Sequence, residues 1–225
     1  MEGPDYIKSI DGAERRFFTS EVRKIVKEQK EGEAEKDALP EIEGYAAKFN
    51  SVTVIGRYWQ FEEEILPGAF DDVLDDDVRC LFNHDPNYVL ARSKGGKGSL
   101  SLSVDSIGLK YGYKTPNRGY AVDLADAIGE GDVSESSFAF QVSEEIWIYG
   151  DESKGILDKR QIVKFSKLYD VAPVTFPAYQ DTEVAQRSLN AFKEKANPND
   201  ENRNSSKNKG LSVLDAQIII NQNSF

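Results

Sequence analysis

The stretch Ser136–Trp147, SSFAFQVSEEIW, decides the fold class of this chain. In an extended strand its Phe138 and Phe140 share one face, and Ser137 lies on the other. A second run, IVKFSKLYDV at residues 162–171, is also typical of a strand and follows a turn-forming Gly-Asp pair. The two runs predict a long β-hairpin.

Short segments of β type, separated by Gly, Asn and Asp, precede this hairpin. Several short strands in a row favour a mainly β fold with some α structure, in which the strands form a sandwich or a closed or partly closed barrel with flanking helices. The predicted strands are residues 44–49, 52–55, 58–61, 78–82, 100–104 and 109–113.

Helical spacing of apolar residues appears at three further places. One helix is predicted after Pro67, where Phe70 and Val73 would share a face. A second is predicted at about residues 120–128, and a third after Thr182.

Composition divides the chain into three parts. Residues 1–38 are dense in charge, which predicts a mobile N-terminal arm in which Ser20 caps a short helix. Residues 39–192 carry the strand and helix patterns and are expected to form the main domain. Residues 193–225 begin with a run of Asn, Lys and Ser that is too poor in apolar groups to offset the entropy of ordering, so a flexible linker and tail are expected.

Charge and composition bound the partners and the compartment. The formal net charge of -11 argues against sequence-independent binding to nucleic acid, which needs clustered Lys and Arg. A protein partner with a basic face fits better. No signal-peptide pattern follows Met1, and no apolar run approaches the roughly 20 residues needed to span a bilayer. We therefore expect a protein that is neither exported nor bound to a membrane.

Metal and cofactor sites find little support in the residue types. Cys80 is the only cysteine, so an intrachain disulfide and a Cys-rich zinc site are both excluded, and a reducing cytoplasm is the natural compartment. The acidic run Glu62–Glu64 is interpreted as a solvated edge strand rather than a pair of glycosidase carboxylates. No metal ion and no other cofactor is predicted.

His84 is the only histidine of the chain. Imidazole is the side chain best suited to general-base work at neutral pH, so any Ser-His mechanism must use His84. The surrounding Asn83–Pro86 also fits an ordinary polar turn, because Asn, Asp and Pro are common turn residues.

Ser137 and Asp170 are the candidate partners of His84. Ser137 would project from a packed strand into a cleft, although a polar residue on an exposed strand face has the same pattern. Asp170 lies in the apolar stretch Leu168–Val174, where a carboxylate needs a partner, catalytic or structural, to offset its desolvation. Asp85 is a poor orienter of His84, because neighbouring side chains in extended backbone point to opposite sides.

Taken in order, these segments resemble the prohead proteases of tailed phages, whose fold is like that of assemblin, the herpesvirus capsid-maturation protease. The resemblance spans about residues 42–187 and implies a herpesvirus-protease-like barrel. The matching segments are Gly44–Ser51, Phe61–Ile65, Pro67–Phe70, Asn83–Asp85, Leu100–Leu102, Gly108–Leu109, Gly131–Val133, Ser137–Phe140 and Asp170–Tyr179.

The resemblance also implies catalytic roles. It makes Ser137 the nucleophile of a serine endopeptidase, His84 its general base and Asp170 the third member of the triad. The sequence departs from the family pattern at three positions. Ala139 stands where the family usually has Gly, and Asp170 and Ala172 replace the usual Glu and Ser.

The task implied by the resemblance is cleavage of scaffold and capsid protein segments, and of the chain itself, inside a procapsid assembling in the host cytoplasm. The expected partners are the scaffold protein and the major capsid protein, and a homo-oligomer is possible. Self-cleavage is expected in the polar run 193–210. The alternatives are a non-catalytic capsid-assembly scaffold or chaperone with the same fold, and an acidic β-domain that binds a basic protein.

Overall fold

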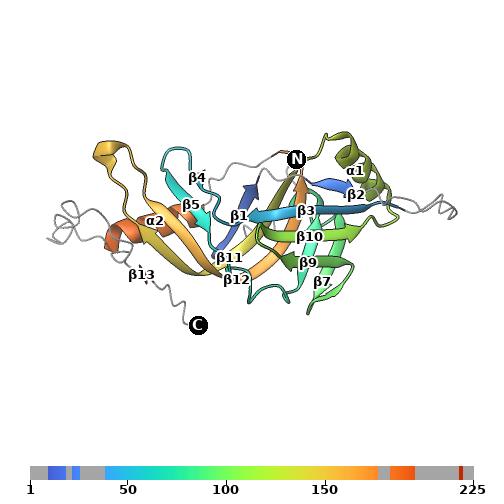
Figure 1. Cartoon of the computed structure of the whole chain (residues 1–225), viewed down its shortest axis with the longest axis horizontal. Coiled ribbons are helices and arrows are strands. Elements are labelled where there is room, and N and C mark those ends of the chain that lie inside the picture. Colours follow the sequence, from blue (N-terminus) through green and yellow to red (C-terminus); the bar gives the residue numbers. More distant parts are fainter. Residues whose placement is uncertain (1–9, 19–21, 26–38, 177–182, 196–217, 220–225) are drawn as a thin grey trace.

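The computed structural model describes residues 10–18, 22–25, 39–176, 183–195 and 218–219. Their strands form two sheets, and the two α-helices lie toward opposite ends of the molecule (Figure 1). The mainly β fold with few helices is confirmed. Neither sheet closes into a barrel through the described strands, so the barrel expectation is not met. The herpesvirus-protease-like fold stays a prediction.

The first sheet is built on the predicted hairpin, which is confirmed as β11 (Glu135–Ile148) and β12 (Lys159–Val174). Its strand order is β1-β11-β12-β6-β7-β8, with β5 also beside β12, β4 beside β5, and β13 beside β11. These other strands are β1 (Ala13–Phe18), β4 (Thr53–Ile55), β5 (Phe61–Ile65), β6 (Val78–Leu81), β7 (Val89–Lys94), β8 (Lys97–Gly98) and β13 (Ile218–Ile219).

The second sheet has the order β2-β3-β10-β9, and all its neighbours are antiparallel. Its apolar face and that of the hairpin share one core, in which Phe138 and Phe140 stack at 4.6 Å between ring centroids. The predicted strands at 44–49, 100–104 and 109–113 are confirmed. The strands of this sheet are β2 (Arg23–Ile25), β3 (Glu41–Lys48), β9 (Leu100–Val104) and β10 (Gly108–Lys114).

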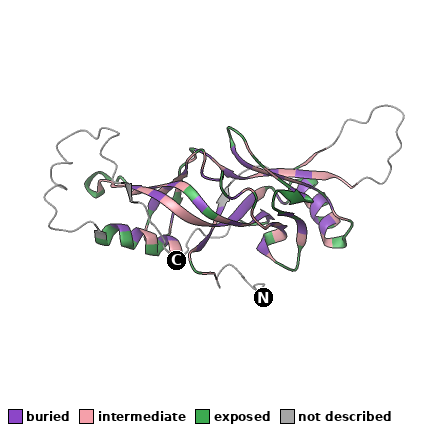
Figure 2. Ribbon diagram, turned by 90° about the horizontal axis from the view of Figure 1, so that it is seen from below, coloured by how far each residue is buried: buried purple, intermediate pink, exposed green. Residues whose placement is uncertain are grey.

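The two helices confirm two of the predicted ones. Helix α1 (Gly119–Glu130) packs apolar residues into the main core and ends at Gly131, whose φ of 86° is the left-handed conformation that favours glycine at a helix end. Helix α2 (Glu183–Lys195) packs Phe192 flat on Trp147 at 4.9 Å between centroids. Figure 2 shows the exposed residues along the other side of α2.

The helix predicted after Pro67 is wrong. Residues 67–75 form successive turns, closed by hydrogen bonds such as Val73 N to Phe70 O at 3.1 Å. Gly68 has a φ of +90°, far from the right-handed helical region, so an α-helix cannot run through it. Phe70 and Val73 are nevertheless buried in the core, so their spacing marks burial rather than a helix.

The N-terminal residues also differ from expectation. Residues 13–18 and 23–25, assigned to a mobile arm, form β1 and β2. The helix predicted from Ser20 is wrong over residues 22–25, and Ser20 itself lies outside the described residues. Division of the chain near residues 38 and 192 stays a prediction.

Two expectations about residues 58–64 are wrong as well. The strand predicted at 58–61 is largely a bend, in which Tyr58 is 86% exposed. The run Glu62–Glu64 belongs to β5, which pairs with β4 on one side and β12 on the other. It is therefore no solvated edge strand, and Glu63 is only 4% exposed.

Candidate active site

His84 lies in a short 3₁₀ turn, Phe82–His84, that follows β6. Asn83 and His84 have φ values of 52° and 58°, in the left-handed region that residues other than glycine seldom adopt. The Asn83 side chain holds this turn, since its Oδ1 accepts from Thr175 N at 2.9 Å and its Nδ2 donates to Thr175 Oγ1 at 3.1 Å. The turn is thereby tied to the end of β12, the strand that carries Asp170.

The structure brings the three predicted site residues together. His84 Nε2 lies 2.6 Å from Ser137 Oγ, and His84 Nδ1 lies 2.7 Å from Asp170 Oδ1. A carboxylate at Nδ1 holds the hydrogen on that nitrogen and leaves Nε2 to accept the serine hydrogen. Both distances are within the range that proton transfer requires.

Strand pairing sets this arrangement. In the β11–β12 hairpin, Ser137 lies opposite Ala172 and Ala139 lies opposite Asp170, so Ser137 and Asp170 share one face of the sheet. Phe138 points to the other face and into the main core. The cleft expected at Ser137 is not open, because Ser137 and Asp170 have no exposed surface and His84 is 6% exposed.

The neighbouring polar groups have other partners. Asp85 Oδ1 accepts from Asn87 N at 2.8 Å, whereas His84 Nδ1 lies against Asp170. Burial, and then the charge of Asp170, raises the pKa of the Cys80 thiol well above its usual value. Cys80 is therefore neutral at physiological pH and unsuited to act as a nucleophile.

Ser136, the serine next to Ser137, is also buried but serves a different contact. Its Oγ lies 2.9 Å from Tyr111 Oη, on the side of the second sheet. Burial raises the pKa of Tyr111 far above its usual range, so the phenol stays neutral and the pair is a plain hydrogen bond. Of these two adjacent serines, Ser137 is the one whose hydroxyl lies within hydrogen-bond distance of His84.

A protein-family model described as Caudovirus prohead serine protease matches residues 25–195. The chain belongs to this family. No curated protein and no solved structure matches it. The resemblance seen in the sequence is thus confirmed, and the chain is a serine protease of phage capsid maturation. Its family acts in the assembling procapsid, where the partners are capsid and scaffold proteins.

One neighbour of the site in this protease was missed by sequence reasoning. Strand β1 pairs with β11 so that Phe17 lies opposite Ser137, and Ser137 Oγ is 2.9 Å from the backbone oxygen of Arg16. The signal in the sequence was the β-forming pair Phe17-Phe18, which directly follows the charged residues Glu14–Arg16.

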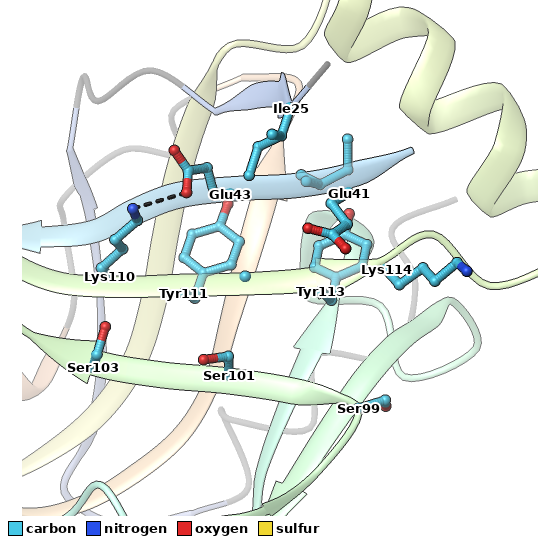
Figure 3. A pocket seen from close by; sticks show the side chains of 12 residues that line it. Ile25, Glu41, Glu43, Ser99, Ser101, Ser103, Lys110, Tyr111, Tyr113 and Lys114 are labelled. Atoms are coloured by element: carbon cyan, nitrogen blue, oxygen red, sulfur yellow. Dashed lines mark ion pairs between the residues drawn. The ribbon is translucent and has the colours of Figure 1, made fainter. Parts of the chain in front are cut away.

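A hollow of about 400 Å³ lies on the second sheet of the protease (Figure 3). Its lining includes Ser101 and Lys110, whose Nζ lies 2.8 Å from Glu43. Ser137, His84 and Asp170 do not line it. It is therefore separate from the candidate active site.

The described residues show neither a metal site nor a membrane-spanning helix. Among them, no group of three or more His, Cys, Asp or Glu side chains is placed to hold a metal ion. In the same part of the chain, no helix has both the length and the apolar character that crossing a bilayer requires.

Proposed function

We propose that this chain is a serine endopeptidase that cleaves scaffold and capsid protein segments during procapsid maturation. In this proposal Ser137 is the nucleophile, His84 the general base and Asp170 the group that orients the imidazole. The observation that carries the assignment is the pair of contacts on opposite nitrogens of His84, at 2.6 Å to Ser137 and 2.7 Å to Asp170.

The mechanism follows from these contacts. His84 Nε2 accepts the hydroxyl hydrogen while Ser137 Oγ attacks the carbonyl carbon of a peptide bond. His84 then donates that hydrogen to the leaving amine, and an acyl-enzyme remains on Ser137. Water, deprotonated by His84, releases the acyl group and restores the serine. Asp170 stabilises the imidazolium that forms in each half of the cycle.

Replacement of the nucleophile tests the proposal. In the variant Ser137→Ala, cleavage of scaffold and capsid protein in coexpressed procapsids is expected to fall by at least about 10⁴-fold, because no covalent intermediate can form. The measurement is the rate at which the processed fragments appear on gels and in mass spectra.

Ser136→Ala is the matched control for that variant. It removes a buried hydroxyl one residue away and leaves Tyr111 Oη without that bond, at a cost of about 1–3 kcal/mol in stability. The folded fraction of Ser136→Ala should still process its substrate. Processing that persists in Ser137→Ala would remove Ser137 from the mechanism, and a wild type that processes nothing would favour the non-catalytic scaffold or chaperone.

We also propose that the enzyme cuts its own chain within the polar run 193–210, after Lys195 where α2 ends, in the host cytoplasm and inside the procapsid. The support is the composition of this run, since proteases need extended substrates that are free of stable structure. Incubated wild type should lose the C-terminal residues as judged by intact mass, whereas Ser137→Ala should keep them. A wild-type tail that stays intact for days while scaffold protein is cut would contradict self-cleavage.

A further inference from the structure

Strand β1 lies along β11 (Figure 1), and its Phe17 is the cross-strand partner of the candidate nucleophile Ser137. Ser137 Oγ is within hydrogen-bond distance of two acceptors, His84 Nε2 at 2.6 Å and the backbone oxygen of Arg16 at 2.9 Å. A hydroxyl has one hydrogen, and general-base catalysis requires that His84 accept it. The Arg16 oxygen therefore competes with His84 for the hydrogen on which catalysis depends.

The same strand covers the backbone edge of β11 beside Ser137. Ser137 has no exposed surface, and the backbone of β11 at residues 136–141 is paired with β1 along its outer edge. If β1 left, this stretch of β11 would become an edge strand with free backbone donors and acceptors. An extended peptide can add to such an edge as a further strand, which is a common mode of peptide recognition.

Buried charges hold β1 in this position. Arg16 donates to both carboxylate oxygens of Glu63 at 2.5 and 2.9 Å, and Arg160 donates to Glu14 at 3.0 Å and to Glu145 at 2.6 Å. None of these five residues is more than 6% exposed. Burial alone would raise the pKa of Glu14, but Arg160 and Arg16 outweigh it and hold that pKa at about 2.

The charges divide between β1 and the rest of the protein. Glu63, Glu145 and Arg160 come from β5, β11 and β12, within the residues that match the family model, whereas β1 lies outside that match. Glu14 and Arg16 are two positions apart, so they point to the same face of an extended strand. Arg160 therefore binds an acidic side chain of β1, and Glu63 binds a basic side chain two positions further along the same strand.

A hollow lies next to these charged residues, beyond the start of β1. The hollow, of about 270 Å³, is lined by residues that include Glu14, Arg160 and, from α2, Arg187 and Ser188. It borders the charged pocket, formed by Glu63, Glu145 and Arg160, on the side from which the chain enters β1. Residues that precede the acidic position of a longer peptide have room there.

We propose that the edge of β11 beside Ser137 is the substrate-binding site, that it selects extended protein segments with an acidic residue two positions before a basic one, and that β1 is an internal segment of this kind that blocks the site. This inference rests on the proposed function, and it names the substrate class and the regulation of the same site. A substrate strand must displace β1 before Ser137 can react.

A reversible cross-link tests the displacement. Ala13 and Gln141 are direct cross-strand partners, at a Cβ separation of about 5 Å that a disulfide can close with a small shift. In the double variant Ala13→Cys with Gln141→Cys, oxidation pins β1 onto β11. Cleavage of purified scaffold protein should fall at least tenfold on oxidation and recover with reductant, and the two single variants should not respond to the oxidant.

The outcomes separate this inference from the proposed function. Equal rates in the oxidised and reduced forms, with Ser137→Ala inactive, would overturn the role of β1 and leave the peptidase assignment intact. If neither the reduced form nor the wild type cleaves scaffold protein free or in procapsids, both proposals fall together.

Two peptides of identical composition test the selected pattern. The first has the sequence of residues 12–18, and the second carries Glu14→Arg together with Arg16→Glu, so that acid and base exchange places. The native order should inhibit cleavage by the reduced double-cysteine variant at least ten times more strongly than the exchanged order. Equal inhibition by the two peptides would refute the proposal that the charged pocket selects an acidic residue two positions before a basic one.

Discussion

Asp170 is fully enclosed, and its Oδ1 lies 2.7 Å from His84 Nδ1. The proposed task of this carboxylate is to keep the hydrogen of the imidazole on Nδ1. An amide in its place donates to Nδ1 instead and favours the tautomer with hydrogen on Nε2, which cannot accept a hydrogen from Ser137.

The variant Asp170→Asn should therefore lower kcat by about 10⁴-fold with little change in fold. The measurement is the cleavage rate of scaffold protein, with circular dichroism to compare the folded states. Asp85→Asn, one residue from His84 but bonded to Asn87, is the control and should cleave at close to the wild-type rate. An Asp170→Asn rate within tenfold of wild type would exclude Asp170 from the triad.

At this scale the sequence identified the three candidates but not how they are held. The lone imidazole, the serine on a strand and the carboxylate in an apolar run were all visible as residue types. Two features were not visible in the sequence: the positive φ of Asn83 and His84, and the bonds from Asn83 to Thr175. They depend on where β12 ends relative to a turn about ninety positions earlier, which no local pattern encodes.

At the scale of elements, β1 depends on ionised carboxylates in a buried setting. The pKa of Glu14 is about 2 in the folded protein, against an ordinary value of 4.5. A lowered folded-state pKa contributes stability that is fully present above 4.5 and is lost as the pH falls toward 2. The difference corresponds to about 3 kcal/mol, at roughly 1.4 kcal/mol for each pH unit.

Urea unfolding between pH 6 and pH 2.5 measures this contribution. The wild type should lose stability more steeply than Glu14→Gln as the pH falls below 4.5, so the difference between the two free energies should narrow. Glu130→Gln, at an exposed position, serves as the control and should follow the wild-type curve. A difference between wild type and Glu14→Gln that stays constant over this range would contradict the role of Glu14.

The elements that the sequence missed share a physical cause. β1 buries Glu14 and Arg16, so a search for apolar periodicity finds charge where a strand face is enclosed. The turns at residues 67–75 bury Phe70 and Val73 at helical spacing without helical hydrogen bonds. In both cases tertiary contacts, rather than local propensity, decide the conformation.

At the scale of the whole molecule, the long hairpin was predictable because its pattern is contiguous in the chain. The strand order of the first sheet was not predictable in this way. β12 pairs in parallel with β5 at residues 159–162 and with β6 at residues 170–171, so the sheet branches along a single strand. Pairing between strands that are remote in sequence leaves no periodic trace, and this is the level at which the expected barrel is not confirmed.

The proposed blocking of the site by β1 has a consequence for when the enzyme works, because β1 is covalently attached. A segment tethered to its own binding site acts at an effective concentration on the order of millimolar. A free target in dilute solution would compete poorly with it, whereas a target crowded to comparable levels would compete well. Proteolysis would then begin once the concentration of the target is high enough to displace β1, and no other signal would be required.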